Sequence, residues 1–311
     1  MESPAATTAP ARAAPPAARK LLVGLIGAGI QRSLTPAMHE EEARHHGLRL
    51  HYQLIDLDRA AGGAQALPLL IAAARTMGFA GLNITYPCKQ AVMPLLDGLD
   101  DEARAMGAVN TVVWREGRLI GHNTDGWGWA WGLQRSLPGA DLARVVLLGA
   151  GGAGSAIAHA VLRLGAQQLS VVDADAARAA ALAADLAARY RSARVVATAD
   201  LVGAMADASG LIHATPTGMA KLPGLPLPAD LLRPGLWVSE IVYFPLATEL
   251  LRAARARGCA TSDGGWMAVG QAIGAFRLFT GLEPDAARID AHLRRLLGQR
   301  AADDDANPPP A

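Results

Sequence analysis

The chain has 311 residues, 51% of them apolar, and a net charge of +1 from 29 basic and 28 acidic residues. This length accommodates two globular domains, and the balanced charge leaves no positive excess to bind nucleic acid or an anionic membrane. The two cysteines, Cys88 and Cys259, lack metal-ligand spacing and are too few for a disulfide framework, so we expect no metal site and a cytoplasmic protein.

Both ends of the chain are expected to be disordered tails. Residues 1–19 are rich in Ala and Pro with scattered Arg, and neither they nor residues 300–311 show an apolar pattern that could pack. A secretory signal peptide is the alternative for the first segment, because an apolar run follows it. However, prolines precede that run and no A-x-A-like cleavage site follows it. The longest run of low polarity, residues 145–162, is interrupted by glycines, Ser155 and His159, which argues against a membrane span.

Short β-like runs alternate with helical patterns from Leu21 to about Gln299, which predicts an α/β fold with largely parallel sheets. The first domain is expected over residues 20–124. Its first helix is predicted to have Thr35 as N-cap and Pro36 at the first helical position, and to end at Gly47. Its strands are predicted over residues 21–26, 50–57, 81–84, 111–114 and 119–121.

The stretch GLNITYPCKQ, residues 81–90, contains one of only three lysines in the chain, the others being Lys20 and Lys221. Arginine keeps its proton in proteins whereas lysine can release it, so a site that needs a reversible proton carrier favours lysine. Lys89 follows a predicted strand at its C-terminal end, where α/β folds place ligands. It is therefore a candidate catalytic base, with an incidental surface lysine as the alternative, and we expect Cys88 beside it to serve in packing.

The stretch GHNTDGWGW places Asp125 beside flexible glycines at the junction of the two predicted domains. A carboxylate at this point could hold the Lys89 ammonium and exchange protons with it. The alternative is that Asp125 caps the helix that follows.

A dinucleotide-binding domain of the Rossmann type is expected over residues 125–262. The pattern strand, glycine loop, helix, strand begins at Arg144, and GAGGAG has the G-x-G-x-x-G spacing that allows a tight turn and the approach of a pyrophosphate. The expected cofactor loop consists of Gly149, Ala150, Gly151, Gly152, Ala153 and Gly154.

Asp173 ends the next predicted strand, about twenty residues after this loop, where an acidic group bonds the adenosine ribose and repels a 2′-phosphate. NAD is therefore the expected cofactor rather than NADP. Asp173 could instead be the N-cap of the following helix, or serve in both roles. Arg178, one turn into that helix, is expected at the adenosine end; it could alternatively accommodate a 2′-phosphate or form a surface salt bridge.

The last segment, residues 263–299, reads as two amphipathic helices, 264–281 and 283–299, with no strand of their own. They must therefore pack against elements already formed, and we expect them to complete the substrate domain. A homodimer and a monomer are both compatible with the sequence.

From Leu25 to Gly281 the chain resembles the shikimate and quinate dehydrogenases, closest in pattern to the NAD-dependent quinate/shikimate enzymes. The matching stretches, in order, are SLTPAMH, GLNITYPCK, GAVNT, NTDGWG, GAGGAG, ATPTGM, EIVYFPLATELL and DGGWMAVGQA. The resemblance implies that Lys89 and Asp125 form the catalytic pair and that Ile241 and Gly264 lie around the nicotinamide. It also implies that polar side chains bind the ring substrate, with Ser33 and Thr35 at its carboxylate. These side chains are Ser33, Thr35, Asn83, Thr85, Asn110, Tyr243 and Gln271.

Each of these residues also has a simpler structural reading. Ser33 and Thr35 could serve in a turn and a cap, Asn83 and Thr85 could find internal partners, and Tyr243 and Gln271 could be a packing residue and a solvated helix residue. Two features depart from the family pattern: His213 replaces the usual Asn, and Trp266 occupies a typically small position next to the cofactor. His213 could be a satisfied core histidine or could shift the cofactor preference.

The resemblance implies reversible oxidation of the ring C3 hydroxyl of quinate or shikimate with NAD, with Lys89 taking the hydroxyl proton. Thr35 and the stretch VVDAD favour a catabolic, NAD-dependent enzyme. One alternative is an NADP-dependent biosynthetic shikimate dehydrogenase. Another is a nucleotide-sensing regulator without catalysis, in which we would expect damage at Lys89 or Asp125.

Overall fold

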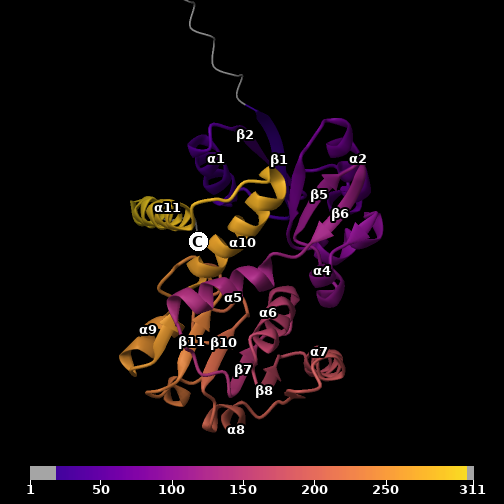
Figure 1. Ribbon diagram of the computed structural model, residues 1–311. Helices are drawn as coiled ribbons and strands as arrows, with labels where there is room; N and C mark the ends of the chain where they lie inside the picture. Colours follow the sequence, from indigo (N-terminus) through magenta and orange to yellow (C-terminus); the bar gives the residue numbers. More distant parts are fainter. Residues whose placement is uncertain (1–18, 307–311) are drawn as a thin grey trace, which may run out of the picture.

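The computed structural model describes residues 19–306, and residues 1–18 and 307–311, which belong to the predicted tails, lie outside this range. Two sheets form two units that are joined through helices α5 and α10 (Figure 1). The strands are β1 (Lys20–Gly27), β2 (Arg49–Asp56), β3 (Gly81–Ile84), β4 (Gly98–Leu99), β5 (Thr111–Arg115), β6 (Arg118–His122), β7 (Arg144–Leu148), β8 (Gln168–Val172), β9 (Arg194–Ala197), β10 (Gly210–His213), β11 (Trp237–Glu240) and β12 (Ala260–Ser262).

The helices cover these sheets and connect them. The α-helices are α1 (Thr35–His45), α2 (Leu67–Thr76), α3 (Cys88–Ala91), α4 (Asp101–Met106), α5 (Asp125–Ser136), α6 (Gly152–Arg163), α7 (Ala176–Arg189), α8 (Leu201–Ala206), α9 (Glu249–Ala256), α10 (Gly264–Thr280) and α11 (Ala286–Ala306). The short 3-10 turns are η1 (Gly63–Ala66), η2 (Met93–Leu95) and η3 (Ala229–Leu231). In the described part of the chain, no helix is both long and apolar enough to cross a membrane.

The first sheet has the strand order β2-β1-β3-β5-β6-β4. Strand β1 pairs in parallel with β2 and β3, while β3, β5 and β6 pair antiparallel. The parallel half follows the predicted strands closely, and strand β3 is buried at every position, including the polar Asn83. The C-terminal ends of β1 and β3 point toward the second unit, so the side chains that follow these two strands face the junction between the units.

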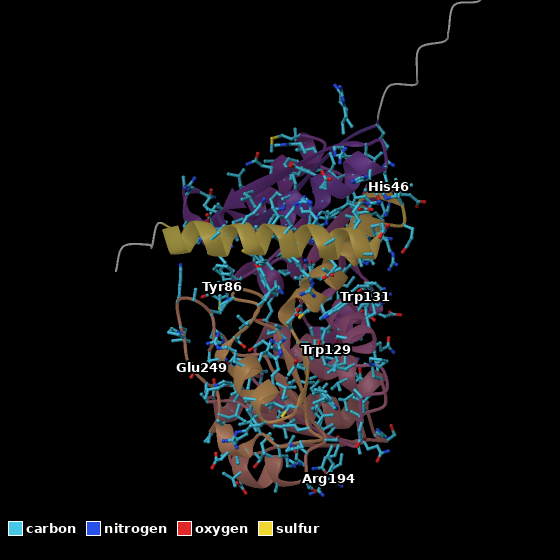
Figure 2. The ribbon with its side chains drawn as sticks, turned by 90° about the vertical axis from the view of Figure 1, so that its left-hand side faces the viewer. His46, Tyr86, Trp129, Trp131, Arg194 and Glu249 are labelled. Atoms are coloured by element: carbon cyan, nitrogen blue, oxygen red, sulfur yellow. The ribbon has the colours of Figure 1, made fainter. Side chains whose placement is uncertain are left out.

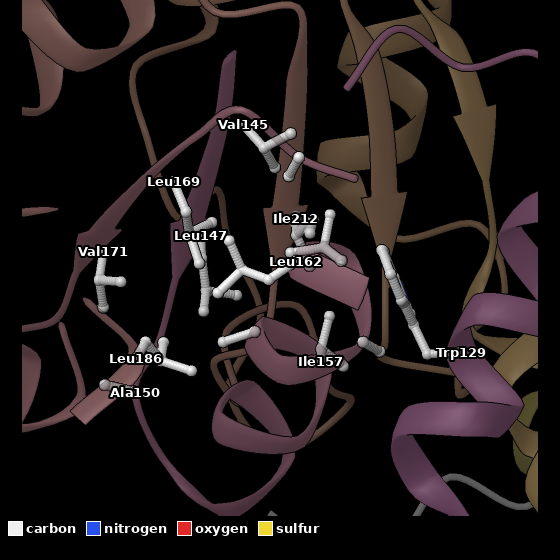
Figure 3. Packing of buried hydrophobic residues seen from close by; sticks show 14 of the residues in the cluster. Trp129, Val145, Leu147, Ala150, Ile157, Leu162, Leu169, Val171, Leu186 and Ile212 are labelled. Carbon is white, nitrogen blue, oxygen red and sulfur yellow. The ribbon is translucent and has the colours of Figure 1, made fainter. Parts of the chain in front are cut away.

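The second sheet is entirely parallel, with the order β12-β11-β10-β7-β8-β9. Numbered from β7, this is the 3-2-1-4-5-6 order of a doubly wound dinucleotide-binding fold. Figure 3 shows the core on one face of this sheet, where Val145 and Leu147 of β7 and Ile212 of β10 pack with Ile157 and Leu162 of α6. The predicted α/β fold with a Rossmann-type unit is confirmed.

The C-terminal helices pack back on the first sheet, as predicted. Phe279 of α10 packs with Val23 and Leu25 of β1, and helix α11 packs with α1 and α10 through a cluster that includes Met38 and Leu293. Helix α10 also crosses α5 very closely, because Gly128 and Gly270 face each other with no side chain between the two backbones. This crossing is the main joint between the two units (Figure 1).

The start of α1 differs from the sequence prediction. Thr35 is the first residue of the helix and not its N-cap, which is Leu34, and no side chain caps the helix. Ser33 Oγ accepts a hydrogen bond from the Thr35 amide at 3.3 Å, so the serine closes the turn, and the helix begins one residue earlier than it would with Thr35 as its N-cap. The predicted end is correct, because Gly47 follows the helix with φ of +69°.

The folded part of the chain extends into both segments that were predicted as tails. Arg19 donates a hydrogen bond to the Thr280 carbonyl at 3.1 Å and so belongs to the folded unit. Helix α11 begins at Ala286 because the Asp285 carboxylate accepts hydrogen bonds from the amides of Ala287 and Arg288. The helix then continues to Ala306, past residue 300, because Ala is a strong helix former and no Gly or Pro interrupts residues 299–306.

Candidate active site

A cavity of about 940 Å³ lies between the two units and is lined by both. Its wall contains every residue predicted to be catalytic or to bind substrate, together with the two residues predicted near the nicotinamide. These residues are Ser33, Thr35, Asn83, Thr85, Lys89, Asn110, Asp125, Ile241, Tyr243, Gly264 and Gln271. The structure therefore brings together groups that lie far apart in the sequence, although their individual roles stay predictions.

The topology explains why these side chains meet. Ser33 follows β1, Lys89 follows β3 and Tyr243 follows β11, and each of these strands ends at the junction between the units. Ligands of α/β sheets bind beyond the carboxyl ends of the strands. Gln271 reaches the same cavity from the middle of α10, which passes across the junction.

Lys89 and Asp125 form an ion pair on the cavity wall. The Lys89 Nζ lies 2.5 Å from Asp125 Oδ2, and the two side chains are 22% and 10% exposed. The alternative that Asp125 only caps α5 is wrong, because Asp125 is the first helical residue and its carboxylate bonds Lys89 and Asn110. The pair is thus shielded from most solvent but open to a molecule in the cavity.

Asn110 holds the second oxygen of this carboxylate. Its Nδ2 donates to Asp125 Oδ1 at 2.8 Å and to Thr124 Oγ1 at 3.0 Å, while its Oδ1 accepts from the Thr124 amide at 2.8 Å. Both carboxylate oxygens therefore have a fixed partner, one amide and one ammonium, which sets the orientation of Asp125 toward Lys89.

A buried tyrosine extends this network into the core of the first unit. Tyr52, in β2, donates its hydroxyl proton to Asn83 Oδ1 at 2.7 Å, and Asn83 Nδ2 donates to Thr111 Oγ1 and to the Asn110 carbonyl. Thr111 Oγ1 in turn donates to Asn110 Oδ1 at 3.0 Å. Burial raises the pKa of Tyr52 well above its usual value, so the phenol stays protonated and acts as a donor.

These hydrogen bonds limit what the amide groups of the two asparagines can offer to a ligand. Asn83 and Asn110 line the cavity, but their amide groups already bond other protein atoms. A bond from either to a ligand would add to these contacts or rearrange them. Asn110 therefore holds Asp125 directly and Asn83 supports Asn110 from behind, while substrate binding by either asparagine stays a prediction.

Cys88 precedes Lys89 but belongs to the hydrophobic core. Its side chain is 1% exposed and packs with residues such as Ile84 and Val92. Burial raises the pKa of its thiol, which disfavours the reactive thiolate. This arrangement agrees with the predicted packing role. No group of three or more His, Cys, Asp or Glu residues that could hold a metal ion occurs in the part of the chain that the structure describes.

The glycine loop fits a dinucleotide on the evidence of its own shape. A Cβ atom at Gly149 would lie 2.6 Å from the Ala214 carbonyl oxygen, and one at Gly154 would clash with the Gly149 carbonyl. By contrast, Gly151 and Gly152 face open space with no atom within 4 Å. The loop thus packs tightly against the protein on one side and is open on the other, at the N-terminus of the twelve-residue helix α6.

The other residues predicted to bind the cofactor do not line the cavity and lie beyond strands β7 and β8 of the second sheet. They are the six residues of the glycine loop, Asp173 and Arg178. Asp173 accepts a hydrogen bond from the Ala150 amide at 2.6 Å, so it is tied directly to the loop. The alternative that Asp173 caps α7 is wrong, because Asp175 is the N-cap. Arg178 pairs with Asp175 at 3.1 Å, the surface salt bridge that was its alternative reading.

The two residues that depart from the family pattern, His213 and Trp266, both contact other protein side chains. His213 is fully buried, and its two ring nitrogens lie 2.8 Å from Glu240 Oε1 and 2.5 Å from Thr215 Oγ1, so it is a satisfied core histidine. Trp266 does not line the cavity. Its ring packs near that of Trp131 and beneath the Arg294 guanidinium, and its place next to the cofactor stays a prediction.

Several residues that line the cavity, or support it from the core, were not found from the sequence. Arg300 lines the cavity although it was assigned to a tail, and Tyr52 was only one position in a strand. Lys221 also lines the cavity, and the scarcity of lysine could have marked it as it marked Lys89. Arg300 and Tyr52 carry no comparable signal, because their importance comes from long-range packing.

Comparison with known proteins gives consistent matches. The model of the shikimate dehydrogenase substrate binding domain matches residues 25–112. A protein of Streptomyces avermitilis, named shikimate dehydrogenase (NADP(+)), is 59% identical over 90% of this chain and 97% of its own length. A protein of Corynebacterium efficiens, named quinate/shikimate dehydrogenase (NAD(+)), is 49% identical over 87% of this chain and 96% of its own length.

A solved structure agrees with these matches. The quinate dehydrogenase of Corynebacterium glutamicum in complex with NAD superposes with a TM-score of 0.85 at 45% identity, covering 89% of this chain and 99% of that one. The relatives share the two-unit fold but differ in the cofactor that their names give.

Proposed function

Because the chain belongs to the family of shikimate and quinate dehydrogenases, we propose that it reversibly oxidises the C3 hydroxyl of quinate or shikimate with NAD. Membership makes it an oxidoreductase that works with a nicotinamide cofactor. The observation that carries the finer proposal is the ion pair of Lys89 and Asp125 on the wall of the cavity between the units.

The reaction separates into a hydride and a proton. A bound nicotinamide supplies the acceptor for the hydride. Lys89 acts as the base in its neutral amine form: its Nζ takes the hydroxyl proton as the alcohol becomes a ketone and is then an ammonium, and it returns this proton in the reverse direction. Asp125, held by Asn110 at its other oxygen, keeps the Nζ aimed into the cavity. An intact pair argues against the alternative of a regulator that has lost catalysis.

The cavity wall suits a ring that carries several hydroxyls and a carboxylate. Ser33, Thr35, Thr85, Tyr243 and Gln271 contribute hydroxyl, phenol and amide groups from both units. A site built from such groups rejects a ring that lacks a matching oxygen, because buried polar groups would then lose their partners.

The preference for NAD rests on two carboxylates. Asp173 is fixed against the glycine loop, and Asp175 lies two residues further on and holds Arg178. A 2′-phosphate in this region would approach both negative charges, while Arg178 is already paired with Asp175. The NADP-dependent biosynthetic activity is the second candidate, and it is favoured by the name of the Streptomyces avermitilis relative.

A steady-state matrix of quinate and shikimate against NAD and NADP tests this proposal. We expect turnover of at least one ring acid, with kcat/KM for NAD at least about tenfold above that for NADP. Replacing Asp173 with Asn removes the charge and should narrow this ratio by about tenfold. The control is Asp185→Asn, because Asp185 is exposed on α7 and should not affect the ratio. Equal or faster turnover with NADP in the unaltered protein would contradict the NAD preference.

Replacing Tyr52 with Phe tests the buried network. The change removes one hydroxyl and leaves Asn83 Oδ1 without its donor, which costs about 1–3 kcal/mol of folding free energy. Because the network ends on Asp125, we also expect kcat to fall about three- to tenfold. Urea unfolding and steady-state kinetics measure the two effects. Tyr190→Phe, which removes a hydroxyl from the His159 contact in the second unit, should leave kcat unchanged. An unaltered kcat in the Tyr52 variant would show that the tyrosine does not position the catalytic pair.

A further inference from the structure

A chain of hydrogen bonds runs through His213 at the end of the second sheet. His213 ends β10, and its ring is fully buried. Its Nδ1 lies 2.8 Å from Oε1 of Glu240, which ends β11, and its Nε2 lies 2.5 Å from Thr215 Oγ1. Figure 2 shows Arg194, which begins the parallel strand β9, at the end of the molecule far from the first unit. The carboxyl ends of this parallel sheet, with the chain of bonds, therefore face the junction between the units.

Glu240 is the fixed end of this chain. Its side chain is fully buried, and both carboxylate oxygens accept further hydrogen bonds. Oε1 accepts from the Val242 amide at 3.0 Å, and Oε2 accepts from the Thr248 hydroxyl at 3.0 Å. Thr248 is the N-cap of α9, where its Oγ1 accepts from the Leu251 amide. Because backbone and helix cap hold the carboxylate on both sides, Glu240 stays turned toward His213.

These bonds set the direction of the hydrogens along the chain. Since the Glu240 oxygens act as acceptors, a neutral imidazole ring at His213 carries its hydrogen on Nδ1. Nε2 then has only a lone pair, so it accepts the hydrogen of the Thr215 hydroxyl. Thr215 Oγ1 keeps its own lone pairs, one of which meets the Thr217 amide at 3.4 Å. The hydroxyl therefore offers an acceptor, and no donor, to a ligand beside it.

Thr215 lies between the glycine loop and the predicted nicotinamide site. It lines the cavity together with Ile241 and Gly264, the two residues predicted near the nicotinamide. The Ile241 amide donates to the His213 carbonyl at 3.2 Å, which ties the two strand ends together. On the other side, a Cβ at Gly149 of the glycine loop would lie 3.1 Å from Thr215 Cγ2. The fixed hydroxyl is thus placed along the span from the pyrophosphate loop to the nicotinamide.

Resting on the proposed function, we propose that His213 and Glu240 are positioning residues that fix the Thr215 hydroxyl as an acceptor for the nicotinamide riboside half of the cofactor. The ribose hydroxyls and the carboxamide NH2 of this half are hydrogen-bond donors, so they match a group that can only accept. Holding this half keeps the nicotinamide ring in place for hydride transfer. The arrangement goes beyond the family pattern, which has Asn at position 213.

The binding test compares NAD with ADP, which lacks the nicotinamide riboside half. Titration calorimetry measures both ligands on Thr215→Val, which removes the hydroxyl, and on His213→Asn, which removes the imidazole acceptor. We expect the Kd for NAD to rise about five- to tenfold in each variant, while the Kd for ADP changes less than about twofold. Thr215→Ser keeps the hydroxyl and should retain NAD affinity within about twofold of the unaltered protein.

Steady-state kinetics and NMR provide two independent readouts. The KM for NAD should rise with its Kd, while the KM for the ring acid at saturating NAD stays unaltered. The ring ¹⁵N signals that disappear in His213→Asn belong to His213 and report where its hydrogen lies. We expect a protonated Nδ1 and an unprotonated Nε2 at neutral pH. A protonated Nε2 would make Thr215 a donor to the cavity and overturn the fixed acceptor.

The matched control is Thr261→Val in strand β12, because the Thr261 hydroxyl bonds Arg255 and does not line the cavity. It should leave both Kd values unaltered. An equal loss of NAD and ADP affinity in the Thr215 and His213 variants would show that the network only supports the fold of the second unit. Unaltered NAD affinity in Thr215→Val would show that the hydroxyl meets no group of the cofactor. Either result overturns the proposal.

The comparison is independent of the substrate and of the choice between NAD and NADP, because both cofactors carry the same nicotinamide riboside half. The expected loss of NAD affinity in a protein that turns over neither quinate nor shikimate would support this proposal and count against the proposed function alone.

Discussion

Replacing Lys89 with Ala is expected to lower kcat by about 10²- to 10⁴-fold, the usual contribution of a positioned general acid–base group. The Nζ lies 2.5 Å from Asp125 in the cavity, and no other lysine adjoins that carboxylate in the described part of the chain. Binding of the cofactor should persist, because the glycine loop and Asp173 lie in the other unit. Steady-state kinetics and fluorescence titration with NAD measure the two properties.

Two further variants separate proton transfer from charge. Lys89→Arg keeps a positive group beside Asp125 but cannot release its proton, so its kcat should fall nearly as far as in the alanine variant. Lys20→Ala changes an exposed lysine at the start of β1 and should leave kcat unaltered. Near-normal turnover in Lys89→Arg would mean that the lysine supplies charge only and that the base has been assigned wrongly.

Replacing Gly128 with Ala should destabilise the protein by about 1–3 kcal/mol or more. The added Cβ would lie 2.8 Å from the Gly270 carbonyl carbon and still closer to the Gln271 backbone nitrogen, much closer than van der Waals contact allows, so helices α5 and α10 would have to separate. Backbone atoms cannot move aside as a flexible side chain can. Urea unfolding followed by circular dichroism measures the loss of folding free energy.

The same variant should lower kcat, because α5 begins with Asp125 and α10 carries Gln271. The matched control is Gly298→Ala in α11, where a Cβ would meet no atom within 4 Å. That change should stabilise the protein slightly, by about 0.5–1 kcal/mol, since Ala is the better helix former. Equal stability of the two variants would show that the helix crossing tolerates separation.

Much of this architecture could be predicted from local signals in the sequence. Strands such as β3 and β7 are short apolar runs between turn residues, and the GAGGAG loop lies between such a strand and a helix, so its place in the fold follows from covalent neighbours. Lys89 and Asp125 could be predicted to lie together, because Lys89 follows a strand end and Asp125 lies at the domain junction. Their ion pair required only that the two segments meet, as parallel α/β topology dictates.

The features that escaped prediction depend on contacts between distant segments. Tyr52 acts through Asn83 across two strands, and nothing in the alternation of residues 50–57 distinguishes its hydroxyl from a solvated one. Arg300 lies in helix α11, and its place on the cavity wall depends on the packing of this helix against α1 and α10. The packing of Trp266 against α5 depends on Gly132, whose missing side chain leaves room for it.

The close crossing of α5 and α10 also limits how the enzyme could be recombined with its relatives. A chimera that took the cofactor-binding sheet from one parent and the C-terminal helices from another would bring together two helix surfaces shaped for different partners. Gly128 and Gly270 tolerate no mismatch between them. Segments 125–136 and 264–280 should therefore be inherited from the same parent, so that the cofactor preference is exchanged without disturbing the catalytic pair.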